Sequence, residues 1–128
     1  MPTEQPKHEQ VVASTAATAA SMRPQNVPVN VYETAGALVI LAVFPAVRPD
    51  DVTIELRGGT VRFWARLRSA GTRDYVVHEW DYGGYEREIE LPEGYGAGVE
   101  ATLANGQLAI RVLRGAPAAP VQISPLAH

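Results

Sequence analysis

The feature of the sequence that most constrains its fold is a series of short apolar segments separated by turn residues. Between Val27 and Leu113, glycine, proline or asparagine interrupts the apolar runs about every ten residues. The runs are rich in valine, isoleucine and leucine, and none repeats with the period of an amphipathic helix. This pattern predicts an all-β domain, specifically an immunoglobulin-like antiparallel β-sandwich.

Each apolar segment is expected to form one strand. The segments are Val27–Val31, Leu38–Phe44, Val52–Leu56, Val61–Leu67, Tyr85–Leu91, Val99–Leu103 and Leu108–Leu113, with Tyr75–Trp80 as a further extended segment. The run Leu38–Phe44 is apolar throughout, which is typical of a strand covered on both faces. Gly58-Gly59 and Asn105-Gly106 are typical of tight hairpin turns. The stretch Gly94–Gly98 is expected to be a loop between strands, because no helix follows it that could make it a phosphate cradle.

The chain of 128 residues has the length of one domain, with a segment of different composition at each end. Residues 1–26 hold few large apolar side chains, so they are expected to be a disordered arm before a domain over residues 27–114. Residues 115–128 are rich in proline and alanine and should be an extended, mobile tail. Within this tail, Val121 and Ile123 point to the same side of an extended chain between Pro120 and Pro125. This arrangement indicates a peptide that docks.

Composition excludes several classes of function. The chain has no cysteine, which excludes disulfides and thiolate sites, and its net charge is −3 without a basic stripe, which argues against nucleic-acid binding. No apolar run approaches the roughly 18 residues that a membrane span needs. The first residues lack the layout of a signal peptide, so a cytoplasmic protein is expected.

The residues that could carry chemistry are scattered. His8, His78 and His128 lie far apart in the sequence, and among them His78 has nearby carboxylates, in Glu79 and Asp81. No serine lies in a nucleophile elbow. The alternating Glu86, Glu88 and Glu90 fit a solvated strand face better than an acid–base pair. We therefore expect no catalytic, metal or cofactor site, and a protein that is not an enzyme.

Arg87 breaks the pattern of its strand. It shares one face with apolar Tyr85, Ile89 and Leu91, so a guanidinium lies on the inward or interface-facing side. Burial of an arginine is costly unless its donors are paired. Either Arg87 is paired at an interface, or its aliphatic stem carries the charge out to solvent.

Four motifs in order resemble the alpha-crystallin domain of small heat-shock proteins of the bacterial type. They are Phe44–Ile54, Tyr82–Pro92, Ala101–Ile110 and the tail triplet Val121–Ile123. Three positions depart from the family pattern. Ala46 replaces a glycine, which implies that the turn need not have a positive φ, while Tyr85 replaces phenylalanine and Gln107 replaces valine.

The resemblance implies an ATP-independent holdase chaperone that binds non-native proteins and assembles as a homodimer or a higher oligomer. It places Arg87 in a dimer-interface ion pair and makes Tyr75–Trp80 a segment that crosses to the partner, with Tyr75, Val77 and Trp80 at the interface. It also implies that Val121 and Ile123 insert into a groove of a neighbouring subunit. The residues implied for that groove are Val52, Ile54, Leu56, Ala101 and Leu103.

Two questions stay open at this point. The sequence does not distinguish a tail that docks in cis from one that docks in trans. The alternative function is a co-chaperone or adaptor module like a CS domain, which needs neither the arginine strand nor the tail triplet. Removal of residues 121–123 should shrink a small heat-shock oligomer and change little in a monomeric adaptor. The short arm, whose bulky apolar groups are Val11, Val12 and Met22, predicts small or dynamic assemblies and modest chaperone strength.

Overall fold

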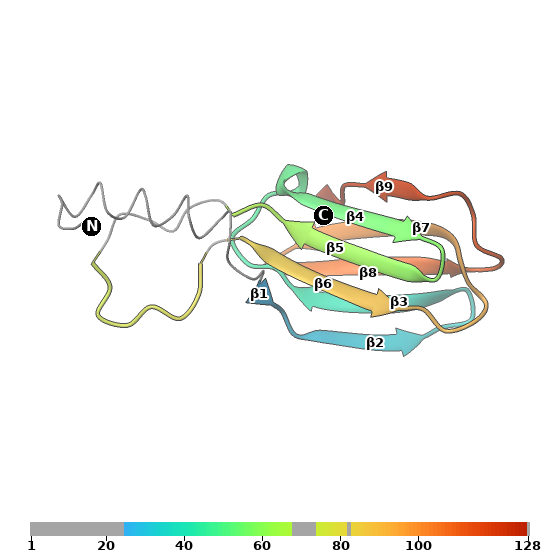
Figure 1. The fold of residues 1–128 in the computed structure, drawn as a ribbon, viewed down its shortest axis with the longest axis horizontal. Coiled ribbons are helices and arrows are strands. Elements are labelled where there is room, and N and C mark those ends of the chain that lie inside the picture. The colour runs from blue at the N-terminus through green and yellow to red at the C-terminus, as the bar shows by residue number, and fades with distance from the viewer. Residues whose placement is uncertain (1–24, 68–73, 82, 128) are drawn as a thin grey trace.

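The computed structural model describes residues 25–67, 74–81 and 83–127, and these form two sheets of five strands each, packed face to face (Figure 1). The first sheet has the order β1 (Gln25–Asn26), β6 (Tyr85–Glu90), β5 (Thr60–Ala65), β4 (Val52–Arg57) and β9 (Val121–Ile123). The second has the order β10 (Leu126–Ala127), β7 (Tyr95–Ala104), β8 (Gln107–Arg114), β3 (Ala37–Val43) and β2 (Val29–Glu33). The all-β sandwich predicted from the sequence is confirmed. Its pairs are antiparallel except for the short β1–β6 and β10–β7 pairs, which are parallel.

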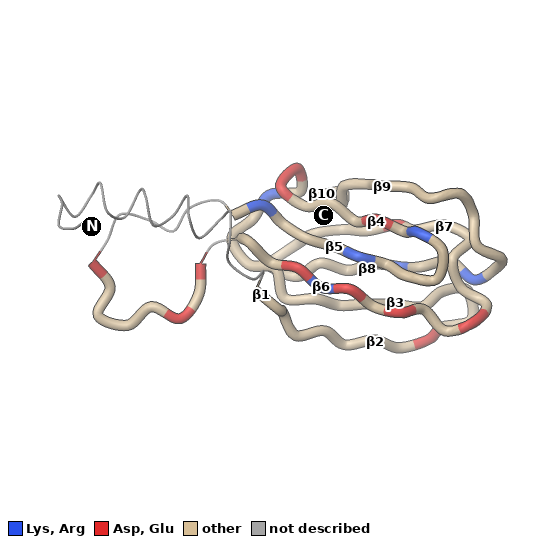
Figure 2. Tube along the Cα trace, in the orientation of Figure 1, with Lys and Arg blue, Asp and Glu red and all other residues tan. Residues whose placement is uncertain are grey.

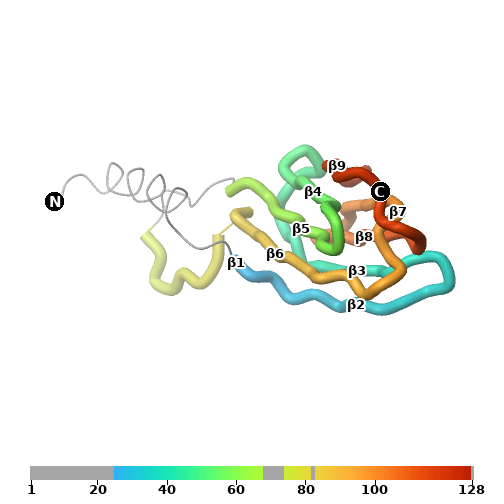
Figure 3. Tube along the Cα trace, turned by 45° about the vertical axis from the view of Figure 1, so that its right-hand side comes forward, coloured from blue at the N-terminus to red at the C-terminus, as the bar shows by residue number. Residues whose placement is uncertain are grey.

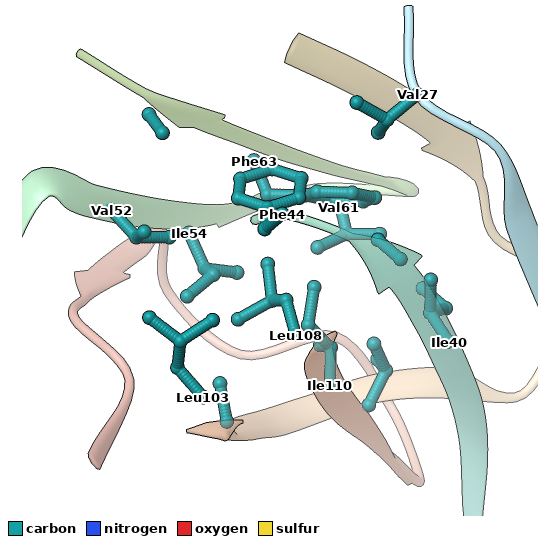
Figure 4. Close-up of a cluster of buried hydrophobic side chains, with 14 of the residues drawn as sticks. Val27, Ile40, Phe44, Val52, Ile54, Val61, Phe63, Leu103, Leu108 and Ile110 are labelled. Carbon is teal, nitrogen blue, oxygen red and sulfur yellow. The ribbon is translucent and has the colours of Figure 1, made fainter. Parts of the chain in front are cut away.

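The core lies between the two sheets and is apolar throughout the described residues. Alternate residues of each strand point inward, so the alternation in the sequence becomes one buried face per sheet. Phe44 and Phe63 lie together at its centre, with ring centroids 5.9 Å apart, and Tyr85 packs on Phe44 at 5.2 Å. Figure 4 shows Ile54, Leu108 and other branched side chains closing around these rings.

Strand β3 behaves as predicted over its first half. Residues 37–40 are buried on both sides of the strand, whereas Leu41 is half-buried and Val43 is 48% exposed. The face of the sheet that turns away from the core is therefore uncovered near the end of β3. The prediction of a strand covered on both faces is wrong for this end.

The outer faces of the two sheets differ in chemistry. The first sheet carries acidic and basic residues along β4, β5 and β6 (Figure 2), and those on its outer face include Glu55, Arg62 and Glu86. Arg62 donates to Glu86 and lies over the ring of Trp64 at 4.3 Å. The hydrogen bond to Glu86 raises the pKa of the Arg62 guanidinium above its ordinary value. Glu86 and Glu88 thus belong to a solvated strand face, as expected.

The structure confirms the prediction for one glycine-containing segment and corrects it for another. Asn105 and Gly106 have φ values of 54° and 75°, which confirms a tight turn with two left-handed residues between β7 and β8. The predicted loop Gly94–Gly98 is mostly strand instead, because β7 begins at Tyr95 and pairs there with Arg114. A register shift between Tyr95 and Val99 absorbs the glycines, and Gly96 has a φ of 133°. The glycines bend the strand rather than end it.

The turn after β3 corrects the expectation at Ala46. Its φ is 63°, so this alanine adopts the left-handed conformation that glycine favours. Two contacts from distant segments impose it. The Phe44 amide donates to the Gly106 carbonyl at 2.8 Å, and the Tyr85 hydroxyl donates to the Pro45 carbonyl at 2.8 Å. These two bonds hold Phe44 and Pro45, the residues just before the left-handed Ala46.

We therefore expect Ala46→Gly to stabilise the protein. Glycine removes the strain of a left-handed alanine, which is worth about 1 kcal/mol. This gain exceeds the free-energy cost of the greater flexibility that glycine gives the unfolded chain. Urea unfolding of the variant should give a higher midpoint at an unchanged slope. Asn105→Gly is the matched control, because asparagine already tolerates this conformation and the gain should be a few tenths of a kcal/mol at most. If the urea midpoint of Ala46→Gly were below that of the parent, Ala46 would not be strained.

Candidate assembly surfaces

The tail lies against the domain of its own chain. Strand β9 extends the first sheet along β4 in antiparallel register, with Ile123 opposite Ile54 and Val121 opposite Leu56. Strand β10 then joins the second sheet along β7 in parallel register, with Leu126 opposite Thr102. The tail was expected to be extended and mobile. It is extended, but two of its segments are paired in sheets, and Figure 3 shows β9 running beside β4.

The tail anchors are buried to different degrees. Val121 is 38% exposed, whereas Ile123 packs against the core cluster. Pro125 is buried, more deeply than either predicted anchor. Pro125 was not predicted as an anchor. The signal was available, because Val121, Ile123 and Pro125 are spaced i, i+2 and i+4 and so share one side of an extended chain.

The predicted groove residues lie on the two strands that the tail joins. Val52, Ile54, Leu56, Ala101 and Leu103 are all buried in the core, on the strands β4 and β7 that the tail joins. A groove of about 460 Å³ opens beside the tail. It is mostly apolar, and its lining includes Ala101, Thr102, Ala109, Ile123 and Leu126. Ala101 is the predicted groove residue that contributes to this lining.

Arg87 lies on the inward face of β6. It pairs in register with the buried Phe63, and its guanidinium donates to the carbonyl of Val27 at 2.7 Å. The side chain is half-buried. Arg87 therefore sits at the open side of the sandwich, between β6 and the chain that leads from β1 into β2.

The segment 74–81 projects from one end of the sandwich (Figure 1). It forms bends and no strand within this chain, so the extended segment expected over Tyr75–Trp80 has no strand partner in its own sheets. Its apolar side chains are open to solvent, with Val76 100% and Val77 69% exposed. Tyr75 stacks on His78 at 4.2 Å, and the His78 Nε2 lies 2.7 Å from an Asp81 oxygen.

The edge strand β2 presents a second open surface. It is the longest of the described strands that lie at a sheet edge, and it has five residues against two or three in β1, β9 and β10. Val31 is opposite the buried Ile40 and so faces the core side, yet it is 42% exposed. Tyr32, on the other side, is 51% exposed. Figures 1 and 3 show β2 and β9 on opposite sides of the molecule.

The described part of the chain contains no cluster of metal-ligating side chains. Within residues 25–67, 74–81 and 83–127, no three histidine, aspartate or glutamate side chains gather as a metal site would require. His78 is occupied with Asp81 and Tyr75, while His8 and His128 lie outside the described residues.

The same ranges contain no helix that is long and apolar enough to cross a bilayer.

Comparisons with known proteins agree on one family. The model of the Hsp20/alpha crystallin family matches residues 30–124. Among solved structures, hspA from Xanthomonas axonopodis is 24% identical with a TM-score of 0.63, and the match covers 73% of this chain and 98% of that one. A small heat-shock protein from Xylella fastidiosa is 23% identical with a TM-score of 0.61, over 76% and 93% of the two chains. Heat shock protein 16.0 from Schizosaccharomyces pombe is 19% identical with a TM-score of 0.58, over 73% and 91%.

No curated protein sequence matches this chain. The structural likenesses are below 25% identity and show the shared fold. The family model covers most of the chain, including the arginine strand, the Asn105-Gly106 hairpin and the tail triplet. The chain therefore belongs to the Hsp20/alpha crystallin family of small heat-shock proteins.

Proposed function

We propose that the protein is an ATP-independent holdase that binds partly unfolded proteins and limits their aggregation. The observation that carries the proposal is the apolar outer face of the second sheet. On this face Tyr32 and Val43 are about half exposed, and Leu41 is paired with Ala109, which lines the groove beside the tail. The opposite face of the sandwich is charged, so the two faces differ sharply in what they can bind.

Non-native proteins expose the apolar side chains that they normally bury, and burial of such surface needs no nucleotide. Each Å² of apolar surface that is covered contributes about 25 cal/mol, so a shallow apolar face can hold many different clients weakly. Glu100 and Arg111, paired at 2.7 Å, lie on the same face and keep part of it hydrated.

The building block is proposed to be a homodimer. The segment 74–81 carries exposed Tyr75, Val77 and Trp80 and pairs with none of the described strands, and β2 is a long open edge. An open edge strand readily accepts a strand from another chain. Arg87 donates to the carbonyl of Val27, just before the open edge strand β2, and this position supports its proposed place at the dimer interface.

The holdase proposal predicts that the full chain suppresses the reductant-induced aggregation of insulin. Light scattering of the client should be roughly halved at a stoichiometric ratio, equally with and without ATP, because capture follows mass action. The reductant leaves the chaperone unchanged, since the chain has no cysteine. Val43→Asp should weaken the protection by charging the apolar face, and Glu88→Gln on the charged face should not. Undiminished aggregation with the parent chain would refute the holdase role.

A further inference from the structure

We propose that the short strand β1 is a latch on the segment 74–81, and that the side chain of Gln25 closes it. With the latch closed, the segment projects in one fixed arrangement and the dimer is favoured. With the latch open, the segment loses that arrangement and the dimer is weakened. The inference rests on the proposed homodimer and names the residue that regulates it.

The side-chain amide of Gln25 is bonded to the base of the segment. Figures 1 and 3 show β1 at the end of the sandwich from which the segment projects. The Gln25 Nε2 donates to the carbonyl of Gly83 at 2.6 Å and to the carbonyl of Asp81 at 3.2 Å. The Oε1 accepts from the amide of Asp81 at 3.3 Å. Both polar atoms of the side chain are therefore used on backbone that lies 56 and 58 positions away in the sequence.

The segment meets the sheet at two glycines. Gly83 and Gly84 have φ values of 94° and 69°, so two consecutive residues adopt the left-handed conformation that glycine enters most easily. The amide of Gly84 donates to the Ala65 carbonyl at 2.9 Å, and its carbonyl accepts from the Gln25 amide at 2.8 Å. Gly84 is thus fixed to the sheet. The side chain of Gln25 extends this hold across Gly83 to Asp81.

Contacts within the segment carry the order onward from Asp81. Its carboxylate lies 2.7 Å from the Nε2 of His78, and the His78 ring stacks on Tyr75 with an angle of 11° between the planes. The chain from Tyr75 to His78 is closed into a bend by these contacts. Val76 and Val77 lie at the tip of this bend and are exposed. A segment that is ordered before it binds loses less conformational entropy on binding, so the closed latch favours the dimer.

The latch itself is weakly held. Strand β1 has two residues, and they pair with β6 as Gln25 opposite Tyr85 and Asn26 opposite Glu86. A strand of this length at a sheet edge opens at a small cost in free energy. Its opening withdraws the Gln25 side chain from the base of the segment. Closure of the latch and formation of the dimer are therefore linked, and each favours the other.

Hydrogen exchange, measured residue by residue, tests the latch within one chain. Gln25→Ala removes the three side-chain bonds, so the Asp81 amide should exchange at least about fivefold faster. The Gly84 amide, which is bonded to Ala65, should stay within about twofold of the parent. Asn26→Ala is the matched control, because it truncates the exposed neighbour in the same strand and should leave both amides unchanged. Unchanged exchange of the Asp81 amide in Gln25→Ala, or equal acceleration at Gly84, would overturn the latch.

Multi-angle light scattering across a dilution series tests the consequence for assembly. Gln25→Ala should raise the dimer dissociation constant about tenfold, and Asn26→Ala should leave it within about twofold of the parent. Gln25→Glu keeps the length of the side chain but places a carboxylate oxygen against the Gly83 carbonyl, so its effect should be at least as large. An unchanged dissociation constant in both Gln25 variants would overturn the latch and leave the dimer standing. A parent chain that is monomeric at every concentration would overturn the proposed dimer, and the role of the latch with it.

Discussion

Replacement of Phe63 by alanine is expected to lower the free energy of unfolding by about 3–5 kcal/mol, the range measured when a buried phenylalanine is truncated. The side chain is fully buried at the centre of the core and lies 5.9 Å from the ring of Phe44. Its removal loses apolar burial and leaves a cavity that the two sheets cannot close without shifting. This loss is comparable to the whole stability of a small domain.

Equilibrium urea unfolding at 25 °C measures this effect, with circular dichroism in the β region as the signal. The matched control is Tyr32→Ala, which truncates an aromatic residue that is 51% exposed and should cost less than about 1 kcal/mol. If both variants unfolded at the same denaturant concentration, Phe63 would not lie in the core. Phe63 also pairs in register with Arg87, so a partly folded variant should show weakened dimers as well.

The second large effect is expected at the proposed dimer interface. Val77→Asp should raise the dimer dissociation constant at least about 100-fold, because it removes a valine that the proposed dimer would bury and adds a carboxylate that the partner would desolvate. In the single chain Val77 is 69% exposed, so the fold itself should tolerate the change. Val31→Asp, on the edge strand β2 that would accept the segment, should have a similar effect.

Multi-angle light scattering across a dilution series gives the mass and the dissociation constant. Val43→Asp is the matched control, since it changes a valine that is 48% exposed on the outer face of the second sheet, in β3 and not in either interface element. The control should remain dimeric while losing client protection. The proposed interface would be wrong if Val77→Asp and Val31→Asp both kept the mass of the parent protein. Unchanged unfolding midpoints would show that the dimer, and not the fold, has been disrupted.

Most of the fold could be predicted because its determinants are local. Alternation in Tyr85–Leu91 marks which residues face inward, and Asn105-Gly106 can adopt the two left-handed conformations that its turn requires. Such signals depend on residues next to each other in the sequence. Alternation also placed Arg87 on the apolar face of its strand. Its pairing opposite the buried Phe63 agrees with that prediction.

The errors arise where distant segments meet. Ala46 was expected to be free of left-handed strain, but bonds from Gly106 and Tyr85 hold its neighbours and force its φ to 63°. The glycine-rich stretch was expected to be a loop, but Arg114 supplies a partner for Tyr95 and draws the segment into β7. In each case a tertiary hydrogen bond outweighs a local preference that is worth about 1 kcal/mol.

The sequence by itself determined the class of fold, the order of the strands along the chain and the family to which the protein belongs. These follow from periodicity, turn residues and short motifs, which are properties of neighbouring positions. Only the tertiary structure decided where the tail lies, which of its two prolines is buried and which sheet edge stays open. These features depend on how β4 of one sheet and β7 of the other are placed in the folded sandwich. Their placement determines which side chains are buried and which backbone groups find partners, and neighbouring positions in the sequence do not encode it.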